Sequence, residues 1–155
     1  MMKTVIRGAV AGAAGTTALN ATAYADMALR GRPTSSVPEQ IVDTAAHKVG
    51  LEVPGEGARR EARLTGLGAL SGIAVGAGVG VAVAVLRAGG IRLPVWVGGT
   101  VTAALAMAAS DLPIAGLGVS DPRTWSAVDW VSDAVPHLVY GLVTYGVVAG
   151  APARR

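Results

Sequence analysis

The sequence predicts an all-α, polytopic membrane protein of about four transmembrane helices, with a short amphipathic helix in the first linker. Three observations lead to this fold class. Of the 155 residues, 52% are hydrophobic and only 15% are charged, and the mean hydropathy is +0.51. The apolar residues gather in stretches that approach the roughly 20 residues a helix needs to cross a bilayer. Inside one of these stretches, glycine recurs at every fourth position.

The predicted spans form a single membrane domain that covers the whole chain. They are residues 5–29, 64–86, 93–109 and 128–149, and a polar linker, 30–63, separates the first two. The first span follows Lys3 and contains Arg7, so it also resembles a secretory signal with an Ala23-Tyr24-Ala25 cleavage site. Its low leucine content argues against cleavage, but both interpretations stay open.

The first linker contains the signals of one short helix. Ser36 and Glu39 have the spacing of a capping box, Pro38 falls in the first turn, and Gly50 follows the last turn. One face of this helix is apolar, and we expect it to rest on the membrane surface or on the bundle. That face consists of Val37, Ile41, Ala45 and Val49.

The glycine row lies in the second span. In water, each glycine would cost a helix about 1 kcal/mol relative to alanine. In lipid, such a row lets a neighbouring helix backbone approach closely, and four glycines exceed what one crossing within the chain needs. We therefore predict helix packing through these glycines, and a homo-oligomer or another membrane protein as partner. The predicted packing residues are Gly68, Gly72, Gly76 and Gly80, with Gly8 and Gly12 of the first span.

The flanks of the spans support a bilayer location but do not give the orientation. The third span begins at Pro94, and Trp96, Trp125 and Trp130 stand near predicted helix ends, where indole prefers the headgroup level. Four spans would place six basic residues on one side and seven on the other, so the positive-inside rule decides nothing. The six are Lys3, Arg7, Arg87, Arg92, Arg154 and Arg155, and the seven are Arg30, Arg32, Lys48, Arg59, Arg60, Arg63 and Arg123.

Composition also excludes several functions. The chain has no cysteine, so disulfides and thiolate chemistry are absent. Its net charge of +3 is spread over the flanks of apolar stretches, so we expect the lipid bilayer as partner and no nucleic acid. Neither Gly-x-Ser-x-Gly nor His-Glu-x-x-His occurs. We therefore predict no enzyme activity and no cofactor.

The last span carries the candidate site, because ionisable groups inside a membrane cost about 2.5–3.5 kcal/mol each on insertion scales. Its polar residues follow helical spacing along one stripe: Asp129, Asp133, His137, Tyr140 and Thr144. Pro136 lacks a backbone donor and is a candidate hinge. An aspartate four residues before a histidine suits a structural hydrogen bond, a proton or ion relay, or a metal site.

A metal would need a third ligand from Asp26 or Asp111, which the spacing alone does not supply, so we assign none. In the first span, Asn20 is the expected donor of a hydrogen bond between helices and joins the candidate relay.

Three segments resemble known proteins: residues 8–20, the linker 32–38, and Pro136-His-Leu-Val-Tyr-Gly141. They resemble small uncharacterised actinobacterial membrane proteins and, more distantly, the YagU-like family of bacterial inner-membrane proteins. The resemblance implies a four-helix protein of the inner membrane with both termini cytoplasmic. It also implies a histidine in the last span that corresponds to His137, and it brings no catalytic activity.

The sequence thus favours a membrane component that packs helices or binds a partner. The alternative is a small proton-linked or ion transporter that uses the stripe of the last span.

Overall fold

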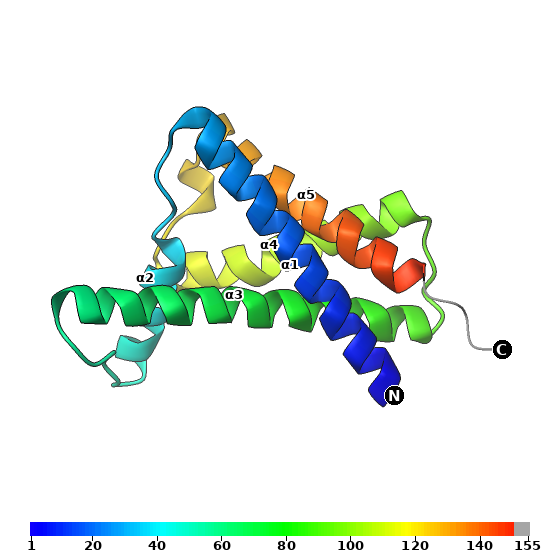
Figure 1. Cartoon of the computed structure of the whole chain (residues 1–155), viewed down its shortest axis with the longest axis horizontal. Coiled ribbons are helices and arrows are strands. Elements are labelled where there is room, and N and C mark those ends of the chain that lie inside the picture. The colour runs from blue at the N-terminus through cyan, green and yellow to red at the C-terminus, as the bar shows by residue number, and fades with distance from the viewer. Residues whose placement is uncertain (151–155) are drawn as a thin grey trace.

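The structure is a computed structural model that describes residues 1–150, and in that range it contains five α-helices and no strand (Figure 1). The helices are α1 (Met2–Arg30), α2 (Val37–Lys48), α3 (Gly57–Ala88), α4 (Val95–Leu117) and α5 (Ala127–Ala149). A 3-10 turn, η1 (Pro122–Thr124), precedes α5. The predicted all-α class is therefore confirmed. Arg154 and Arg155, counted above among the basic residues, lie outside the described residues.

The four long helices run back and forth between two ends of the molecule. Figure 1 shows the N-terminus, the α3–α4 connection and the end of α5 together on the right. The linker with α2, and the connection between α4 and α5, lie on the opposite side. Helix α1 packs on α3 and on α5, and α5 packs on α4. Successive long helices therefore alternate in direction, and both ends of the described chain lie on the same side.

Two helices are long and apolar enough to cross a membrane, which falls short of the four predicted. They are α3, with a mean hydropathy of 2.2 in its best window, and α4, with 1.4. Helices α1 and α5 have sufficient length, at 29 and 23 residues, but polar residues interrupt them. Arg7 and Asn20 lie in α1, and Asp133 and His137 lie in α5.

Two helix boundaries differ from the prediction. Helix α3 begins at Gly57 instead of 64, so the charged run 59–63 forms its first turns. Helix α4 continues past Ala109 to Leu117. The Ser110 hydroxyl donates to the Ala106 carbonyl within the helix, and α4 ends where Gly118 takes a left-handed φ of 74°. The predicted span ended at Ala109 and so left Ser110 outside it.

Helix α2 forms where the linker signals predicted it, but without the predicted capping box. Ser36 has ψ near 4°, so its hydroxyl cannot reach the third amide of the helix and accepts instead from Gln40 Nε2 at 2.8 Å. Glu39 accepts from the Thr65 hydroxyl of α3 at 3.1 Å. Helix α2 packs on α3 and α4, with Pro38 against Gly68. Of the predicted apolar face, Val37, Ile41 and Ala45 are half-buried, but Val49 is 70% exposed.

An ion pair also fastens α2 to α3. The Arg60 guanidinium bonds to the Asp43 carboxylate and holds the pKa of that carboxyl below its ordinary value. The carboxylate form is therefore favoured in the folded chain. The ion pair therefore stabilises the folded chain above the unfolded pKa of about 4. This stabilisation is lost as the pH falls through the lower pKa of the folded state.

Helices α1 and α3 cross in direct backbone contact. A methyl group on Gly8 would lie 2.5 Å from Val81 Cα, and one on Gly80 would lie 2.7 Å from Gly12 Cα. A methyl group on Gly12 would collide with the Gly76 carbonyl oxygen. Gly8, Gly12, Gly76 and Gly80 are all buried. These four predicted positions therefore pack helices, within one chain.

The sequence had suggested that the glycine row of α3 forms one packing face. In the structure it does not. Each four-residue step turns about 40° around a helix of 3.6 residues per turn, so the row winds across two neighbours. Gly68 faces Pro38 of α2, while Gly76 and Gly80 face α1. Gly72 lies between them, exposed, and nothing stands within 4 Å of the place of its missing side chain.

Helices α4 and α5 cross in the same manner, through glycines that the sequence analysis did not single out. A methyl group on Gly141 would lie 2.5 Å from Ala103 N, and one on Gly99 would lie 2.6 Å from Leu142 Cδ2. The Tyr145 ring covers Gly98. The pair Gly98-Gly99 was the available signal, and it was overlooked because its spacing forms no four-residue row.

Replacing Gly12 by alanine should destabilise the folded chain by about 1–3 kcal/mol, because overpacking forces the two backbones apart. The same change at Gly78 should be neutral or stabilise by up to about 1 kcal/mol, since nothing lies within 4 Å there and alanine favours helix. Unfolding in mixed micelles of rising SDS content, followed by circular dichroism, measures both free energies. Equal stabilities of the two variants would contradict the direct contact of α1 and α3.

Candidate functional site

The polar stripe of α5 faces the bundle and becomes more buried along the helix. The side chains of Asp133 and His137 are 22% and 13% exposed, respectively. Tyr140 is 1% exposed and Thr144 is fully buried. These four predicted residues do share one inward face. The stripe therefore leads from a half-buried end into the core.

Asp129 does not belong to this inward face. Its carboxylate accepts from the Ser126 amide at 2.9 Å, and its own amide donates to the Ser126 hydroxyl at 3.2 Å. This reciprocal pair is a capping box at the start of α5. Asp129 is exposed, so the position that the sequence gave to the relay is a helix cap. The spacing Ser126-x-x-Asp129 was the signal for it.

His137 is fixed by the turn of helix that precedes it. Its Nδ1 lies 2.9 Å from the Asp133 carbonyl oxygen and 3.2 Å from Asp133 Oδ1. Because both neighbours are oxygens, Nδ1 carries the proton in the neutral ring. The second nitrogen, Nε2, is then the acceptor and points toward α4. This is the arrangement by which a carboxylate orients an imidazole.

Helix α4 completes the site with two residues. Ser110 Oγ lies 3.5 Å from His137 Nε2, at the limit of hydrogen bonding, and 3.4 Å from Asp111 Oδ1. The hydroxyl already donates to the Ala106 carbonyl at 3.1 Å, so Nε2 receives no strong bond from it. We call Asp133, His137, Ser110 and Asp111 the α4–α5 cluster.

The cluster has one buried oxygen that nothing satisfies. Asp133 Oδ2 is shielded from solvent and has no hydrogen-bond partner within residues 1–150. A buried acceptor in this state is costly unless a proton, water or cation reaches it. In the described range, no three His, Cys, Asp or Glu side chains converge as metal ligands. Asp26, considered above as a third ligand, pairs instead with Arg30 and Arg32, at 2.6 Å each.

Asn20 does not join the cluster. Its side chain is exposed on α1 and forms no hydrogen bond to another helix in the part of the chain that the structure describes. The expected bond fails because the inward face of α1 is defined by Gly8, Gly12 and Gly15. The residues that meet His137 come from α4, which the sequence could not place beside α5.

Pro136 is buried inside α5, between Asp133 and His137. The helix stays continuous through it, from Ala127 to Ala149. A proline donates no bond to the carbonyl four residues earlier, here that of Ser132. Its role as a hinge stays a prediction.

The inner part of the stripe joins three helices. The Tyr140 hydroxyl donates to the Gly76 carbonyl of α3 at 2.6 Å. A methyl group on Gly15 of α1 would lie 2.7 Å from the Tyr140 ring and would collide with the Thr144 hydroxyl. Tyr140 therefore fits only because α1 and α3 both present glycine to it. This end of the stripe is structural.

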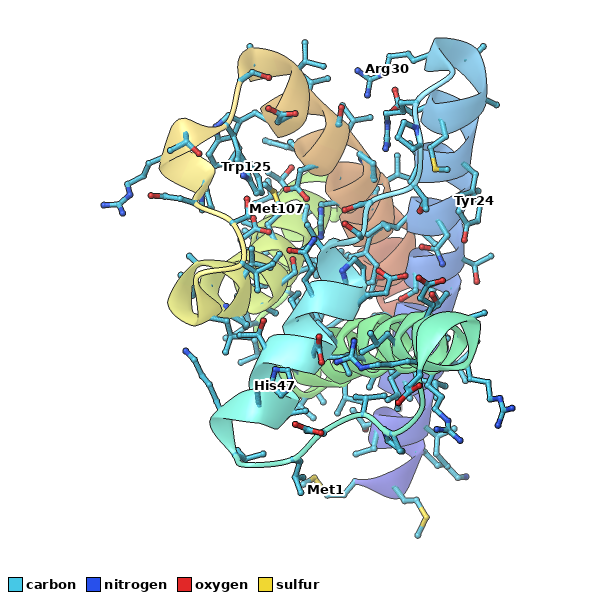
Figure 2. All side chains as sticks on the ribbon, turned by 90° about the vertical axis from the view of Figure 1, so that its left-hand side faces the viewer. Met1, Tyr24, Arg30, His47, Met107 and Trp125 are labelled. Carbon is cyan, nitrogen blue, oxygen red and sulfur yellow. The ribbon has the colours of Figure 1, made fainter. Side chains whose placement is uncertain are left out.

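Figure 2 shows the molecule from the side of α2, with Met107 of α4 and Trp125, beside the start of α5, labelled. The Trp125 and Trp130 rings stack edge to face with centroids 5.1 Å apart.

Comparison with known proteins gives no relative from which a role could be transferred: no protein-family model, curated protein or solved structure matches this chain.

Replacing Tyr140 by phenylalanine should lower the free energy of unfolding by about 0.5–1.5 kcal/mol, since it removes one buried hydrogen bond and leaves the ring in place. The matched control is Tyr24→Phe, because Tyr24 is 62% exposed. Unfolding in SDS-containing mixed micelles measures the difference. A loss no larger than that of the control would show that the bond to Gly76 contributes nothing.

Proposed function

We propose that this chain is a four-span protein of the bacterial inner membrane, without enzyme activity, whose α4–α5 cluster takes up and releases protons. The observation that carries the proposal is the state of His137. One ring nitrogen is held by Asp133, while the other has only a long contact to Ser110. An imidazole so held can accept a proton at Nε2 without first breaking a strong bond.

The membrane location rests on the surfaces of the long helices. A bilayer core of about 30 Å suits α3 and α4, which meet the length and hydropathy of a span. Helix α1 packs on α3 and α5 packs on α4, and Figure 1 shows each pair running in opposite directions, so a bilayer that encloses α3 and α4 encloses α1 and α5. Large apolar side chains on α1 and α5, such as Val10 and Val147, are exposed in the isolated chain. Lipid would cover them.

The chemistry of the cluster fits protons better than a larger ion. Asp133 and His137 form a titratable pair, and the unsatisfied Asp133 Oδ2 is an acceptor for one more proton. Asp111 adds a second carboxylate next to Ser110. At about 1.5 Å per residue, His137 lies roughly 10 Å along α5 from Trp130, a belt candidate. Protons would therefore reach the cluster from the α2 side of the bundle.

A second candidate function is helix packing against another protein, and it has one observation in its favour. Of the predicted glycine row, Gly72 alone keeps an open space beside it. A partner helix could approach α3 there. The case is weaker than the sequence suggested, since the other three glycines of the row already meet α1 or α2. The resemblance to the YagU-like family stays a prediction and would fit either function.

Proton flux in sealed proteoliposomes tests the first proposal. With an internal pH dye and an imposed pH gradient, the native chain should move protons faster than protein-free liposomes. Asp133→Asn and His137→Ala should each reduce the flux to the protein-free level, because each removes one partner of the titratable pair. Asp129→Asn is the matched control, since Asp129 caps the same helix but lies outside the cluster.

The variants are compared only after their circular dichroism and elution volume match those of the native chain. Native flux in both cluster variants, or no flux from the native chain at any pH between about 5 and 8, would contradict proton transfer and leave the packing function.

A further inference from the structure

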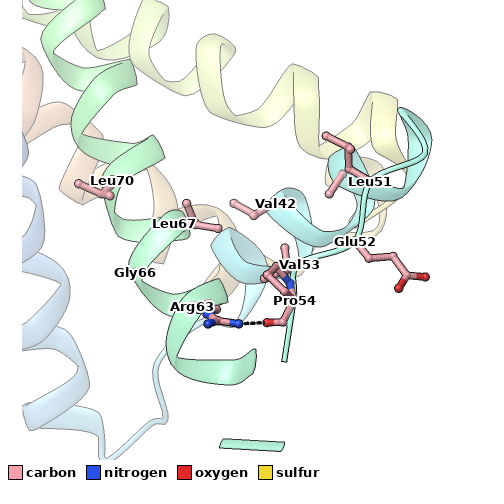
Figure 3. Close-up of a pocket in the computed structure, with 10 residues that line it drawn as sticks. Val42, Leu51, Glu52, Val53, Pro54, Arg63, Gly66, Leu67 and Leu70 are labelled. Atoms are coloured by element: carbon pink, nitrogen blue, oxygen red, sulfur yellow. Dashed lines mark hydrogen bonds between the residues drawn. The ribbon is translucent and has the colours of Figure 1, made fainter. Parts of the chain in front are cut away.

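An apolar groove opens between α2, the loop after it and the first apolar turns of α3 (Figure 3). Its volume is about 530 Å³, and it is open to the surroundings rather than enclosed. Side chains of leucine and valine make most of its wall. They are Val42, Leu51, Val53, Leu67 and Leu70.

The groove is hollow because one residue of its wall is glycine. Arg63, Gly66, Leu67 and Leu70 follow one another on a single face of α3. Nothing lies within 4 Å of the place where a Gly66 side chain would begin. Val53 of the loop 51–54 is buried, but the loop leaves this space open. A Cβ at Gly66 would therefore meet no other atom, and a longer side chain there would extend into the groove.

Two charged residues line the groove, Arg63 and Glu52, and Figure 3 shows the Glu52 side chain directed away from Arg63. Most of the remaining wall is apolar. Arg63 is the last charged residue before the apolar part of α3, and its guanidinium lies at the mouth of the groove, where it donates to the Pro54 carbonyl. Beyond it, Leu67 and Leu70 are exposed to what surrounds the helix. The groove thus crosses the border between the polar flank and the apolar part of α3.

We propose that this groove binds one phospholipid of the bilayer, with an acyl chain along Leu67 and Leu70 and the phosphate on Arg63. The proposal rests on the membrane location proposed above. In a bilayer, the surroundings of an exposed leucine face are acyl chains, and arginine at the headgroup level attracts a lipid phosphate. The bond to Pro54 uses one of the five N–H donors of the guanidinium, so the other four can bind a lipid phosphate at the same time.

Native mass spectrometry of the detergent-solubilised chain, titrated with phosphatidylglycerol, tests the proposal. The native chain should retain one lipid at low lipid concentration. Gly66→Leu should lower the affinity about tenfold by filling the groove. The matched control is Gly78→Leu on the same helix, where the space is also open but lies outside the groove, and it should bind as the native chain does.

A second pair of variants tests the phosphate contact. Arg63→Gln should weaken binding about fivefold, while Arg63→Lys should keep most of the affinity, because it retains the positive charge. Equal lipid affinities of the Gly66 and Gly78 variants would overturn the site. If the native chain is a dimer and Gly66→Leu dissociates it, the groove binds a second copy of the chain, and the lipid site is overturned.

A separate experiment tests the membrane location on which the lipid site rests. Cell fractionation of the native chain precedes the titration, and recovery in the soluble fraction would overturn the membrane location and this lipid site together. Recovery in the membrane fraction, followed by equal affinities, would overturn the lipid site alone.

Discussion

At the crossing of α1 and α3 the two backbones touch, because glycines of both helices face each other with no side chain between them. This contact sets the distance between the two helices. The core beside it then has room for one large residue, Tyr140 of α5, whose hydroxyl reaches the Gly76 carbonyl. Helix α5 is thereby held against α1 and α3, and α4 follows through its own glycine contact with α5. A bulkier residue at the crossing would disturb each of these steps.

The same arrangement buries the inner part of the α5 stripe more deeply than its outer part. Tyr140 and Thr144 lie where three helices meet, and they are almost fully buried. Asp133 and His137 lie farther out, beside Ser110 of α4 and next to Ser132, which accepts a hydrogen bond from Arg30 of α1. One oxygen of the Asp133 carboxylate is left unsatisfied there. In the tight contact Tyr140 bonds to Gly76, while the buried Thr144 hydroxyl has no partner within the described residues. In the looser contact the unpartnered group is Asp133 Oδ2, which belongs to a carboxylate.

The helices were predictable because apolar length and glycine content are properties of single segments. The contacts between segments were predictable only in part. That Asp133 and His137 share one face followed from helical spacing, but their direction did not, and Ser110 lies on a helix that was predicted to end at Ala109 and continues to Leu117. The Asn20 amide could form a hydrogen bond to another helix, but it lies on an exposed face of α1. Asp129 has the spacing of the stripe, yet it caps α5, since a local bond to Ser126 competes with the inward position.

The account depends above all on α1 and α5 crossing the bilayer together with α3 and α4. The chain has no cysteine, so single cysteines placed at Met2, Ser35, Ile91, Thr124 and Gly150 report the side on which each position lies. Labelling of intact spheroplasts with a membrane-impermeant maleimide should find Met2, Ile91 and Gly150 on one side and Ser35 and Thr124 on the other. Met2 and Ser35 on the same side would show that α1 does not cross, and would contradict the four-span bundle.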